Sequence, residues 1–219
     1  MRNINKEEVF RISSMVKVHI VTVGAPPEPP IEGIKKFGCE VLYLIVNEFS
    51  RETGEKVMKM IEPFNIKTEM IEVDVYNIPS IVRKIRDLIR KEGAKGNEIY
   101  LNLTGGRKTL PFAVMLAGFF ESQHVKKIFY VAEEGNKIVE LPILPLESTS
   151  ILTKEKFEIL QLLGRKRRLT IKEVSKLTKK SIPICHQHLS DLEEKGFVVS
   201  EKKGKEKVFE ISELGRILL

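Results

Sequence analysis

Hydrophobic and polar positions change their spacing along the chain, and the change divides it into two parts. In the first part, short apolar runs rich in β-branched residues alternate with segments in which apolar residues recur every three or four positions. The runs are typical of buried strands, and the spaced segments are typical of amphipathic helices. After Pro145 and the polar residues that follow it, helical spacing dominates. We therefore expect an alternating strand–helix domain followed by a mainly helical one.

The first part contains six predicted strands, most of them separated by a predicted helix. The strands are residues 16–23, 39–46, 67–73, a fourth that begins at Glu98, 127–132 and 137–144. The helices are residues 31–37, a segment capped by Ser50, a longer segment capped by Asn77, and residues 109–121. This alternation predicts an α/β, Rossmann-like, mostly parallel sheet, with the last two strands as an antiparallel hairpin at one edge.

The segment from Glu98 to Lys108, EIYLNLTGGRK, joins the fourth strand to the next helix. Its glycine pair ends the strand where the helix begins, so backbone N–H groups lie beside a helix N-terminus together with the cations of Arg107 and Lys108. That combination favours an anion, and phosphate is the obvious candidate. The alternative is a tight turn that needs two glycines for its backbone angles, with both cations in water. The spacing fits neither GxxxxGK[ST] nor GxGxxG, so the pattern alone leaves both interpretations open.

A doubly wound sheet also predicts where a ligand binds. Ligands of such sheets lie beyond the carboxyl ends of the strands, at the crevice where the strand order reverses. Three loops are expected to converge there, and they are residues 24–30, 74–77 and 104–108. The candidate ligand-binding residues are Gly24, Ala25, Pro26, Asp74, Asn102, Thr104, Gly105, Gly106, Arg107 and Lys108.

The second part is predicted to be a winged helix-turn-helix. It contains an amphipathic helix, a short helix opened by a T-x-x-E capping box, a helix with proline in its first turn, and a hairpin with a basic tip. These elements begin at Thr153, Thr170, Ser181 and Phe197. Their order is typical of winged DNA-binding domains. The alternative, a helical dimerisation module, leaves the basic hairpin unexplained.

In a winged helix-turn-helix, the helix after Ser181 enters the major groove, and the hairpin contacts phosphate. The basic run that starts at Arg165 either contacts phosphate or is a solvated loop, and its neighbours favour the first interpretation. The candidate DNA-binding residues are Arg165, Arg167, Arg168, Ser181, Pro183, His186, Gln187, Lys202, Lys203, Lys205 and Lys207. The stretch from Cys185 to His188 is a poor metal site, because three neighbouring positions on one helix cannot all point at one ion. No metal is expected.

Charge is distributed unevenly between the two parts. Residues 153–219 contain 16 Lys and Arg against 10 Asp and Glu, a net charge of +6, which leaves +1 of the total of +7 for the first 152 residues. A basic module attached to a nearly neutral domain is the electrostatic pattern of nucleic-acid binding.

Cysteine content and the N-terminus indicate the compartment. Two cysteines, Cys39 and Cys185, exclude a disulfide framework and indicate a reducing environment. No apolar run is long enough to span a bilayer, and the charged N-terminus lacks the apolar core of a signal peptide. We expect a cytoplasmic protein without a membrane partner, translated from Met1 or Met15. The expected domains are residues 1–146 and 153–219, joined by a linker at 147–152.

The fourth-strand motif and the order of the domains together resemble the CRISPR-associated CARF-domain transcriptional regulators, over nearly the whole chain from Val16. The usual family motif, N-x-T-G-G-T-K, is matched by Asn102, Thr104, Gly105, Gly106 and Lys108, with Arg107 in place of a threonine. The first-strand loop, APPEPP, departs from the polar residues that family members often carry there. The resemblance implies a homodimer that binds a cyclic oligoadenylate, most often cyclic tetra-adenylate, across its two-fold axis and binds double-stranded DNA.

Two other functions stay open at this point. Some CARF domains are similar to ring nucleases, in which a ribose 2′-hydroxyl attacks the adjacent phosphate, and Arg107 or Lys108 would stabilise the developing charge. The three loops offer no evident general base apart from Asp74 and Glu28, so no catalytic residue is assigned. The other possibility is a dimeric DNA-binding protein that binds no nucleotide.

Overall fold

The computed structural model describes residues 15–146, 151–204 and 206–219. The chain divides into two compact units at Pro145 and Leu146. Most of the expected linker, residues 147–150, lies outside the described residues, as does Lys205.

The first unit is built on one six-stranded sheet in the order β3-β2-β1-β4-β5-β6. Every neighbouring pair is parallel except β5 and β6, which are antiparallel. The strands are β1 Lys17–Thr22, β2 Val41–Val46, β3 Lys67–Glu72, β4 Glu98–Asn102, β5 Val125–Val131 and β6 Ile138–Leu141. The predicted α/β, Rossmann-like sheet with an antiparallel edge hairpin is therefore confirmed. Its strand order reverses between β1 and β4, so the carboxyl ends of these two strands mark the expected crevice.

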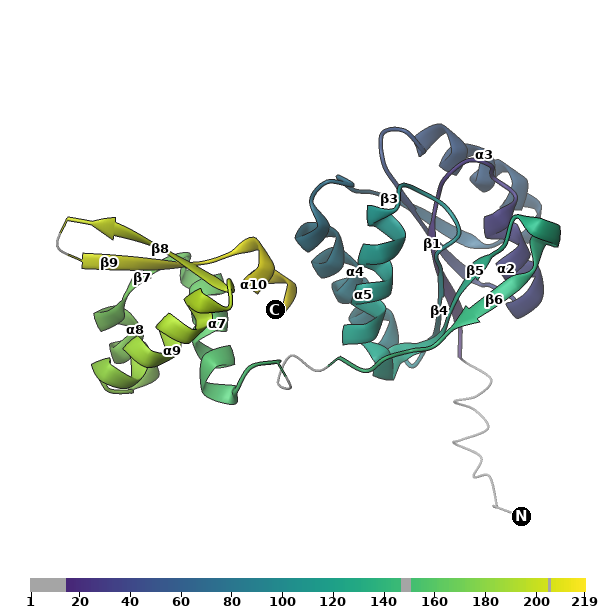
Figure 1. Ribbon diagram of the computed structural model, residues 1–219. Coiled ribbons are helices and arrows are strands. Elements are labelled where there is room, and N and C mark those ends of the chain that lie inside the picture. Colours follow the sequence, from purple (N-terminus) through teal and green to yellow (C-terminus); the bar gives the residue numbers. More distant parts are fainter. Residues whose placement is uncertain (1–14, 147–150, 205) are drawn as a thin grey trace, which may run out of the picture. The chain divides into compact units, whose positions relative to one another are not determined.

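In the part of the chain that the structure describes, four α-helices cover the two faces of this sheet. Helices α4 and α5 lie side by side on one face, and α2 and α3 lie on the other (Figure 1). Their bounds are α2 Pro29–Phe37, α3 Arg51–Ile61, α4 Ile78–Gly93 and α5 Thr109–Phe120. Helix α2 begins two residues earlier than predicted, because prolines are tolerated in the first turn of a helix, where no N–H partner is needed. Short 3-10 turns occupy Glu62–Phe64, Ser122–His124 and Glu134–Asn136.

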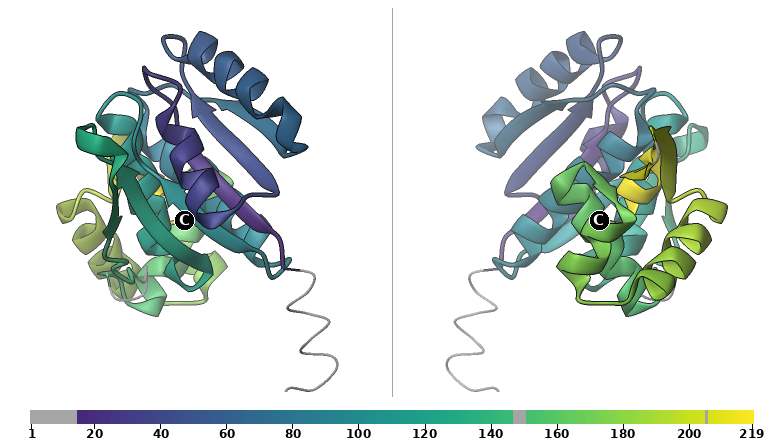
Figure 2. Two further views of the ribbon diagram at one scale, coloured as in Figure 1. Left: turned by 90° about the vertical axis from the view of Figure 1, so that its right-hand side faces the viewer. Right: turned by 90° about the vertical axis from the view of Figure 1, so that its left-hand side faces the viewer.

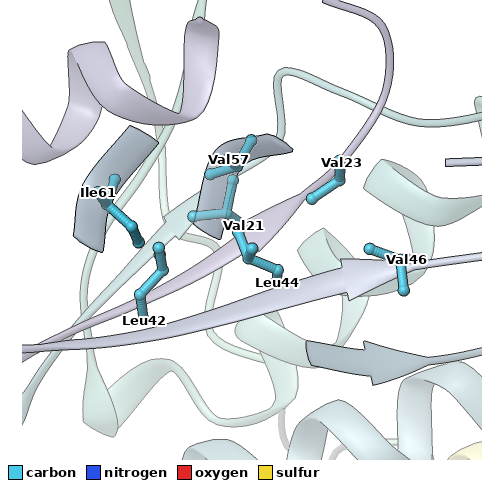
Figure 3. Packing of buried hydrophobic residues seen from close by; sticks show 7 residues of the cluster. All are labelled: Val21, Val23, Leu42, Leu44, Val46, Val57 and Ile61. Atoms are coloured by element: carbon cyan, nitrogen blue, oxygen red, sulfur yellow. The ribbon is translucent and has the colours of Figure 1, made fainter. Parts of the chain in front are cut away.

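Packing between the sheet and its helices is dry and aliphatic. Under α3, the side chains of Val57 and Ile61 meet those of Val21, Leu42 and Leu44 from β1 and β2, and all are 2% exposed or less (Figure 3). Helix α5 is apolar nearly all round, as the sequence predicts, and buries Leu110, Ala113, Val114 and Ala117 among others. Burial of this kind contributes roughly 1.5 to 3 kcal/mol for each large aliphatic side chain, and it holds the loops above the sheet in place.

The two edges of the sheet differ in character. The outermost strand on one side, β3, alternates exposed Lys67 and Glu69 with half-buried side chains, and Glu72 is exposed at its end. The strand at the opposite end, β6, is mostly half-buried and is paired to β5 (Figure 2).

The second unit is a winged helix-turn-helix, as predicted. Its elements are α7 Lys154–Lys166, β7 Arg168–Thr170, α8 Ile171–Thr178, α9 Ile182–Glu194, β8 Val198–Lys203, β9 Glu206–Ile211 and α10 Glu213–Ile217. The capping box is present, since the Thr170 hydroxyl accepts the Glu173 N–H and the Glu173 side chain accepts the Thr170 N–H. Strand β7 was not predicted. It pairs with β9 and makes the hairpin part of a three-stranded sheet in the order β7-β9-β8 (Figure 1).

Among the described residues, no helix has both the length and the apolar character needed to cross a membrane.

Candidate ligand pocket and DNA-binding surface

Two of the three predicted loops touch each other backbone to backbone. A Cβ atom added to Gly24 would lie 2.3 Å from the Gly106 nitrogen, and one added to Gly105 would lie 2.4 Å from the Gly24 nitrogen. Both distances are far below van der Waals contact. Gly106 also has a φ of +91°, which side chains with a Cβ rarely adopt. The glycines are therefore required for close approach of the loops after β1 and β4.

Asn102 and Thr104 connect the end of β4 to its neighbours. Asn102 is completely buried, and its Oδ1 accepts the Thr104 N–H at 3.1 Å and the Thr104 hydroxyl. The Thr104 Oγ1 in turn accepts the Val131 N–H at 2.9 Å. Asn102, a predicted ligand-binding residue, is thus buried beneath the loop and does not line the cavity described below. Its role is to position Thr104.

A cavity of about 700 Å³ opens between these loops and the turn that follows β5. It is lined by Gly24, Ala25, Pro26, Pro29, Pro30, Thr104, Gly105, Tyr130, Val131, Ala132, Glu133, Glu134 and Asn136. Five of the ten candidate ligand-binding residues are in this lining. The segment from Tyr130 to Asn136 was not predicted to take part. It enters the site because β5 is the neighbour of β4, a pairing that the sequence does not state.

The start of α5 is open to an anion. Lys108 is its N-cap residue, no side chain caps the first turn, and that turn contains no acidic residue. Within the described residues, no carboxylate pairs with Lys108, and the buried Thr109 hydroxyl has no protein partner. Unpaired N–H groups at a helix start, together with a lysine, are favourable for phosphate.

The Arg107 side chain contacts the loops after β2 and β3, which do not line the cavity. Its guanidinium lies 4.2 Å from the centroid of the Phe49 ring, and its Nη1 donates to the Tyr76 hydroxyl at 3.1 Å. Asp74 does not meet the glycine loops. It lines a separate hollow of about 340 Å³ with Asn47, Glu48, Glu72, Val73, Val75 and Tyr76. Of the three predicted loops, the first and the third line the cavity, whereas the second borders this separate hollow and reaches the glycine loop through the Tyr76 hydroxyl, which accepts from Arg107.

In the second unit, α9 presents a mixed polar and apolar face to solvent. Ser181, Pro183, His186 and Gln187 are all exposed, whereas Cys185 is fully buried with Leu189 and Leu192. Cys185 therefore belongs to the core of this unit. The described residues contain no group of three or more His, Cys, Asp or Glu that is arranged to hold a metal.

The basic residues predicted to contact DNA fall into two groups. Arg165, Arg167, Lys202 and Lys203 are exposed, and no carboxylate of the described residues pairs with them. Arg168 and Lys207 are instead engaged within the unit. The Arg168 Nε lies 2.9 Å from Glu210 Oε2, and the Lys207 Nζ lies 2.8 Å from Glu193 Oε2. The Lys207 ammonium and the Ser200 hydroxyl hold the pKa of the Glu193 carboxyl below its usual value.

Comparison with known families decides what kind of chain this is. Residues 17–136, more than half of the chain, match the HFX_2341-like, N-terminal domain family. The chain belongs to this family. Residues 154–199 match a winged helix-turn-helix DNA-binding family, so this HFX_2341-like protein carries a DNA-binding domain after its Rossmann-like domain. The domain order predicted from the sequence, a Rossmann-like domain followed by a winged helix-turn-helix, is confirmed.

Relatives match over most of the chain. An uncharacterized protein from Archaeoglobus fulgidus is 26% identical over 214 residues, which are 91% of this chain and 95% of that protein. Protein VC1899 from Vibrio cholerae shares the fold with a TM-score of 0.50 and 15% identity, covering 91% of this chain and 63% of VC1899. Can2 from Sulfobacillus thermosulfidooxidans, solved in complex with cyclic tetra-adenylate, has a TM-score of 0.47 and 16% identity, covering 93% and 62%. The HFX_2341-like chain thus spans less than two thirds of both solved chains.

Proposed function

We propose that this protein is a DNA-binding transcriptional regulator of a CRISPR system that responds to a cyclic oligoadenylate, with cyclic tetra-adenylate as the first candidate ligand. One observation carries the proposal. A cavity of about 700 Å³ lies at the strand-order reversal and is lined in part by Thr104 and Gly105, and the same loop leads to the uncapped start of α5 at Lys108. A phosphodiester offers the negative charge that this helix start lacks, and the backbone of the glycine loops is close enough to contact it.

Two copies of the chain complete the site in this proposal. A cyclic tetranucleotide with two-fold symmetry presents equivalent phosphates to equivalent loops, so each subunit supplies one cradle of residues 104–108. The expected stoichiometry is therefore one ring for two chains. Two subunits also place two α9 helices for two half-sites on double-stranded DNA.

The ligand half of the proposal is tested by calorimetry with cyclic tri-, tetra- and hexa-adenylate. The Lys108→Ala variant is expected to weaken binding by about 1.5 to 3 kcal/mol, because a charge-assisted hydrogen bond is lost. Lys91→Ala is the matched control, because it removes an exposed lysine from the last turn of a different helix, α4. Equal affinities of the wild type and the Lys108→Ala variant would exclude the cradle as the binding site.

The DNA half is tested with mixed-sequence duplex DNA at fixed salt. Lys202→Ala and Lys203→Ala should each weaken binding and reduce the slope of log affinity against log salt by about one. Unchanged slopes in both variants would mean that the hairpin does not contact phosphate.

A second candidate function is slow cleavage of the bound ring, and it rests on the carboxylates of Glu133 and Glu134 in the cavity wall. A carboxylate near a ribose would take the 2′-hydroxyl proton as the oxygen attacks phosphorus, and the 5′-oxygen would leave with a proton. The products are linear oligoadenylates that end in a 2′,3′-cyclic phosphate. Labelled cyclic tetra-adenylate with protein in excess tests it, and loss of product in Glu133→Gln or Glu134→Gln would assign the base.

A further inference from the structure

Two exposed aromatic rings flank Arg107 above the sheet. Phe49, after β2, is 60% exposed, and Tyr76, after β3, is 71% exposed. The Arg107 guanidinium lies 4.2 Å from the centroid of the Phe49 ring and 6.0 Å from that of Tyr76. Large aromatic side chains are costly to leave in water, so two of them held around one cation on the ligand-binding edge of a sheet require an explanation.

The loops that carry these rings are fixed from beneath. Asn47, which is 2% exposed, accepts the Phe49 N–H at 2.8 Å with its Oδ1. The Asp74 Oδ1 accepts the Tyr76 N–H at 2.9 Å. The Tyr76 hydroxyl accepts from Arg107, which joins the second loop to the glycine loop. The two rings and the guanidinium therefore form one preorganised surface, which we call the aromatic shelf.

A hollow borders the shelf. It has a volume of about 340 Å³, and Tyr76 is part of its lining together with the carboxylates of Glu48, Glu72 and Asp74. The Glu72 carboxylate is held by Arg51 at 2.7 Å, while Glu48 has no ion-pair partner in the described part of the chain. Carboxylates repel phosphate and accept hydrogen bonds from amino groups. The hollow is therefore suited to a group that donates hydrogen bonds and carries no negative charge.

We propose that the aromatic shelf of Phe49, Tyr76 and Arg107 stacks a nucleobase, and that the adjoining hollow accepts the exocyclic amine of adenine. Every base has a π-face that stacks on an aromatic ring or a guanidinium, and the carboxylates add preference for an amino group. The inference rests on the proposed function, since the base belongs to the cyclic oligoadenylate whose phosphates are proposed to lie at residues 104–108. It assigns Arg107 to the base and leaves Lys108 to the phosphate.

A fluorescence experiment tests the shelf without the phosphate cradle. The chain contains no tryptophan, so Tyr76→Trp places a single reporter on the shelf. Phe64→Trp places one on an aromatic position of the same unit that is 66% exposed but lies elsewhere, after α3. Adenosine should quench the Tyr76→Trp emission and leave Phe64→Trp unchanged. Inosine, which has a carbonyl in place of the amine, should quench Tyr76→Trp less at the same concentration.

Calorimetry with cyclic tetra-adenylate connects the shelf to the whole ligand. Tyr76→Ala and Phe49→Ala are expected to lower affinity about tenfold, as loss of one base–aromatic contact does, and Phe64→Ala should not. One outcome would overturn the shelf alone: cyclic tetra-adenylate binds, all three variants bind it as the wild type does, and adenosine does not quench Tyr76→Trp. The proposed phosphate site at residues 104–108 would be unaffected by that outcome. If no cyclic oligoadenylate binds, the proposed function fails. The adenosine fluorescence experiment then tests the shelf by itself. Quenching confined to Tyr76→Trp supports the shelf, and no quenching of Tyr76→Trp overturns it.

Discussion

The hydroxyl of Thr104 accepts the backbone N–H of Val131 at 2.9 Å, which ties the loop after β4 to the end of β5. The same hydroxyl donates to the buried Oδ1 of Asn102. These two bonds set the distance between the walls of the cavity, because Thr104 and Val131 both line it. The threonine of the T-G-G-R-K segment therefore acts on the shape of the site rather than as a free hydroxyl for a ligand.

Replacement of Thr104 by valine should lower both stability and ligand affinity. The substitution keeps the shape but leaves the Val131 N–H without a partner and removes one of the two hydrogen bonds that the Asn102 oxygen accepts, which costs about 1 to 3 kcal/mol. Urea unfolding followed by circular dichroism measures the stability change. Thr104→Ser retains the hydroxyl and is expected to stay close to the wild type. Equal loss in both variants would mean that the methyl group, not the hydrogen bonds, matters.

Replacement of Gly105 by alanine should be more harmful than a glycine replacement elsewhere. The new Cβ would lie 2.4 Å from the Gly24 nitrogen and 2.6 Å from the Thr22 oxygen, both backbone atoms that cannot turn away. We expect about 1 to 3 kcal/mol of destabilisation and loss of cyclic tetra-adenylate binding. Gly96→Ala meets no atom within 4 Å and costs only its positive φ, about 1 kcal/mol, with ligand binding intact. Comparison of the two melting temperatures and two titrations checks both expectations.

Release of Lys207 from Glu193 should strengthen binding to DNA. Glu193→Gln removes the carboxylate that holds the Lys207 ammonium at 2.8 Å, so the cation becomes free to contact phosphate. Glu194→Gln removes the same charge from the next residue of α9, which has no ion pair among the described residues, and so controls for net charge. We expect a steeper salt dependence for Glu193→Gln than for Glu194→Gln, by about one unit of log–log slope. Identical slopes would show that Lys207 does not reach DNA.

Acid should destabilise the first unit through His19. This residue is fully buried in β1 and stacked on Tyr100 with ring centroids 4.9 Å apart, and burial lowers its pKa to about 4. Between pH 6.5 and 4 the unfolded chain binds a proton that the folded chain does not, so stability is complete above pH 6.5 and falls as the pH falls. The loss amounts to about 2 to 3 kcal/mol near pH 4. His19→Gln, which cannot titrate, should show a flatter dependence in this window. A pH dependence identical to the wild type would assign the effect to other groups.

Ligand and DNA should influence each other's binding if the protein is a regulator. Saturating cyclic tetra-adenylate is expected to change the affinity for DNA by about 1 to 3 kcal/mol, and linkage requires DNA to change ligand affinity by the same factor. Titration of duplex DNA at constant salt, with and without ligand, measures the first factor, and calorimetry with and without DNA measures the second. Equal DNA affinities in protein that binds both partners would show that the two units act independently.

The fold could be predicted from the sequence because the spacing of hydrophobic residues indicates its strands and helices. The buried strands and the helices capped by Asn77 and Thr170 are local features, which depend on residues that are close together in the sequence. Strand β7 was missed because three residues between two helices, Arg168–Thr170, have no period of their own and become a strand only by pairing with β9.

The site was predicted less completely, and the reason is strand order. The glycine loops could be found from the T-G-G pattern, but the wall from Tyr130 to Asn136 enters only because β5 lies next to β4. Asn102 matched a motif, yet its side chain is buried beneath Thr104. A motif match identifies which residues matter without stating whether they touch a ligand or support the residue that does.

The charged outer strand β3 also governs how the protein behaves in a crowded cell. An open strand edge offers unpaired N–H and C=O groups to any passing extended chain, and natural proteins limit such growth with charges along the edge. Lys67, Glu69 and Glu72 are exposed along β3, so a foreign strand that docked there would bring its own side chains against charges of both signs. This edge therefore resists fibril-like extension of the sheet, and neutral replacements at Lys67 and Glu69 would create an aggregation-prone surface without any change in the fold.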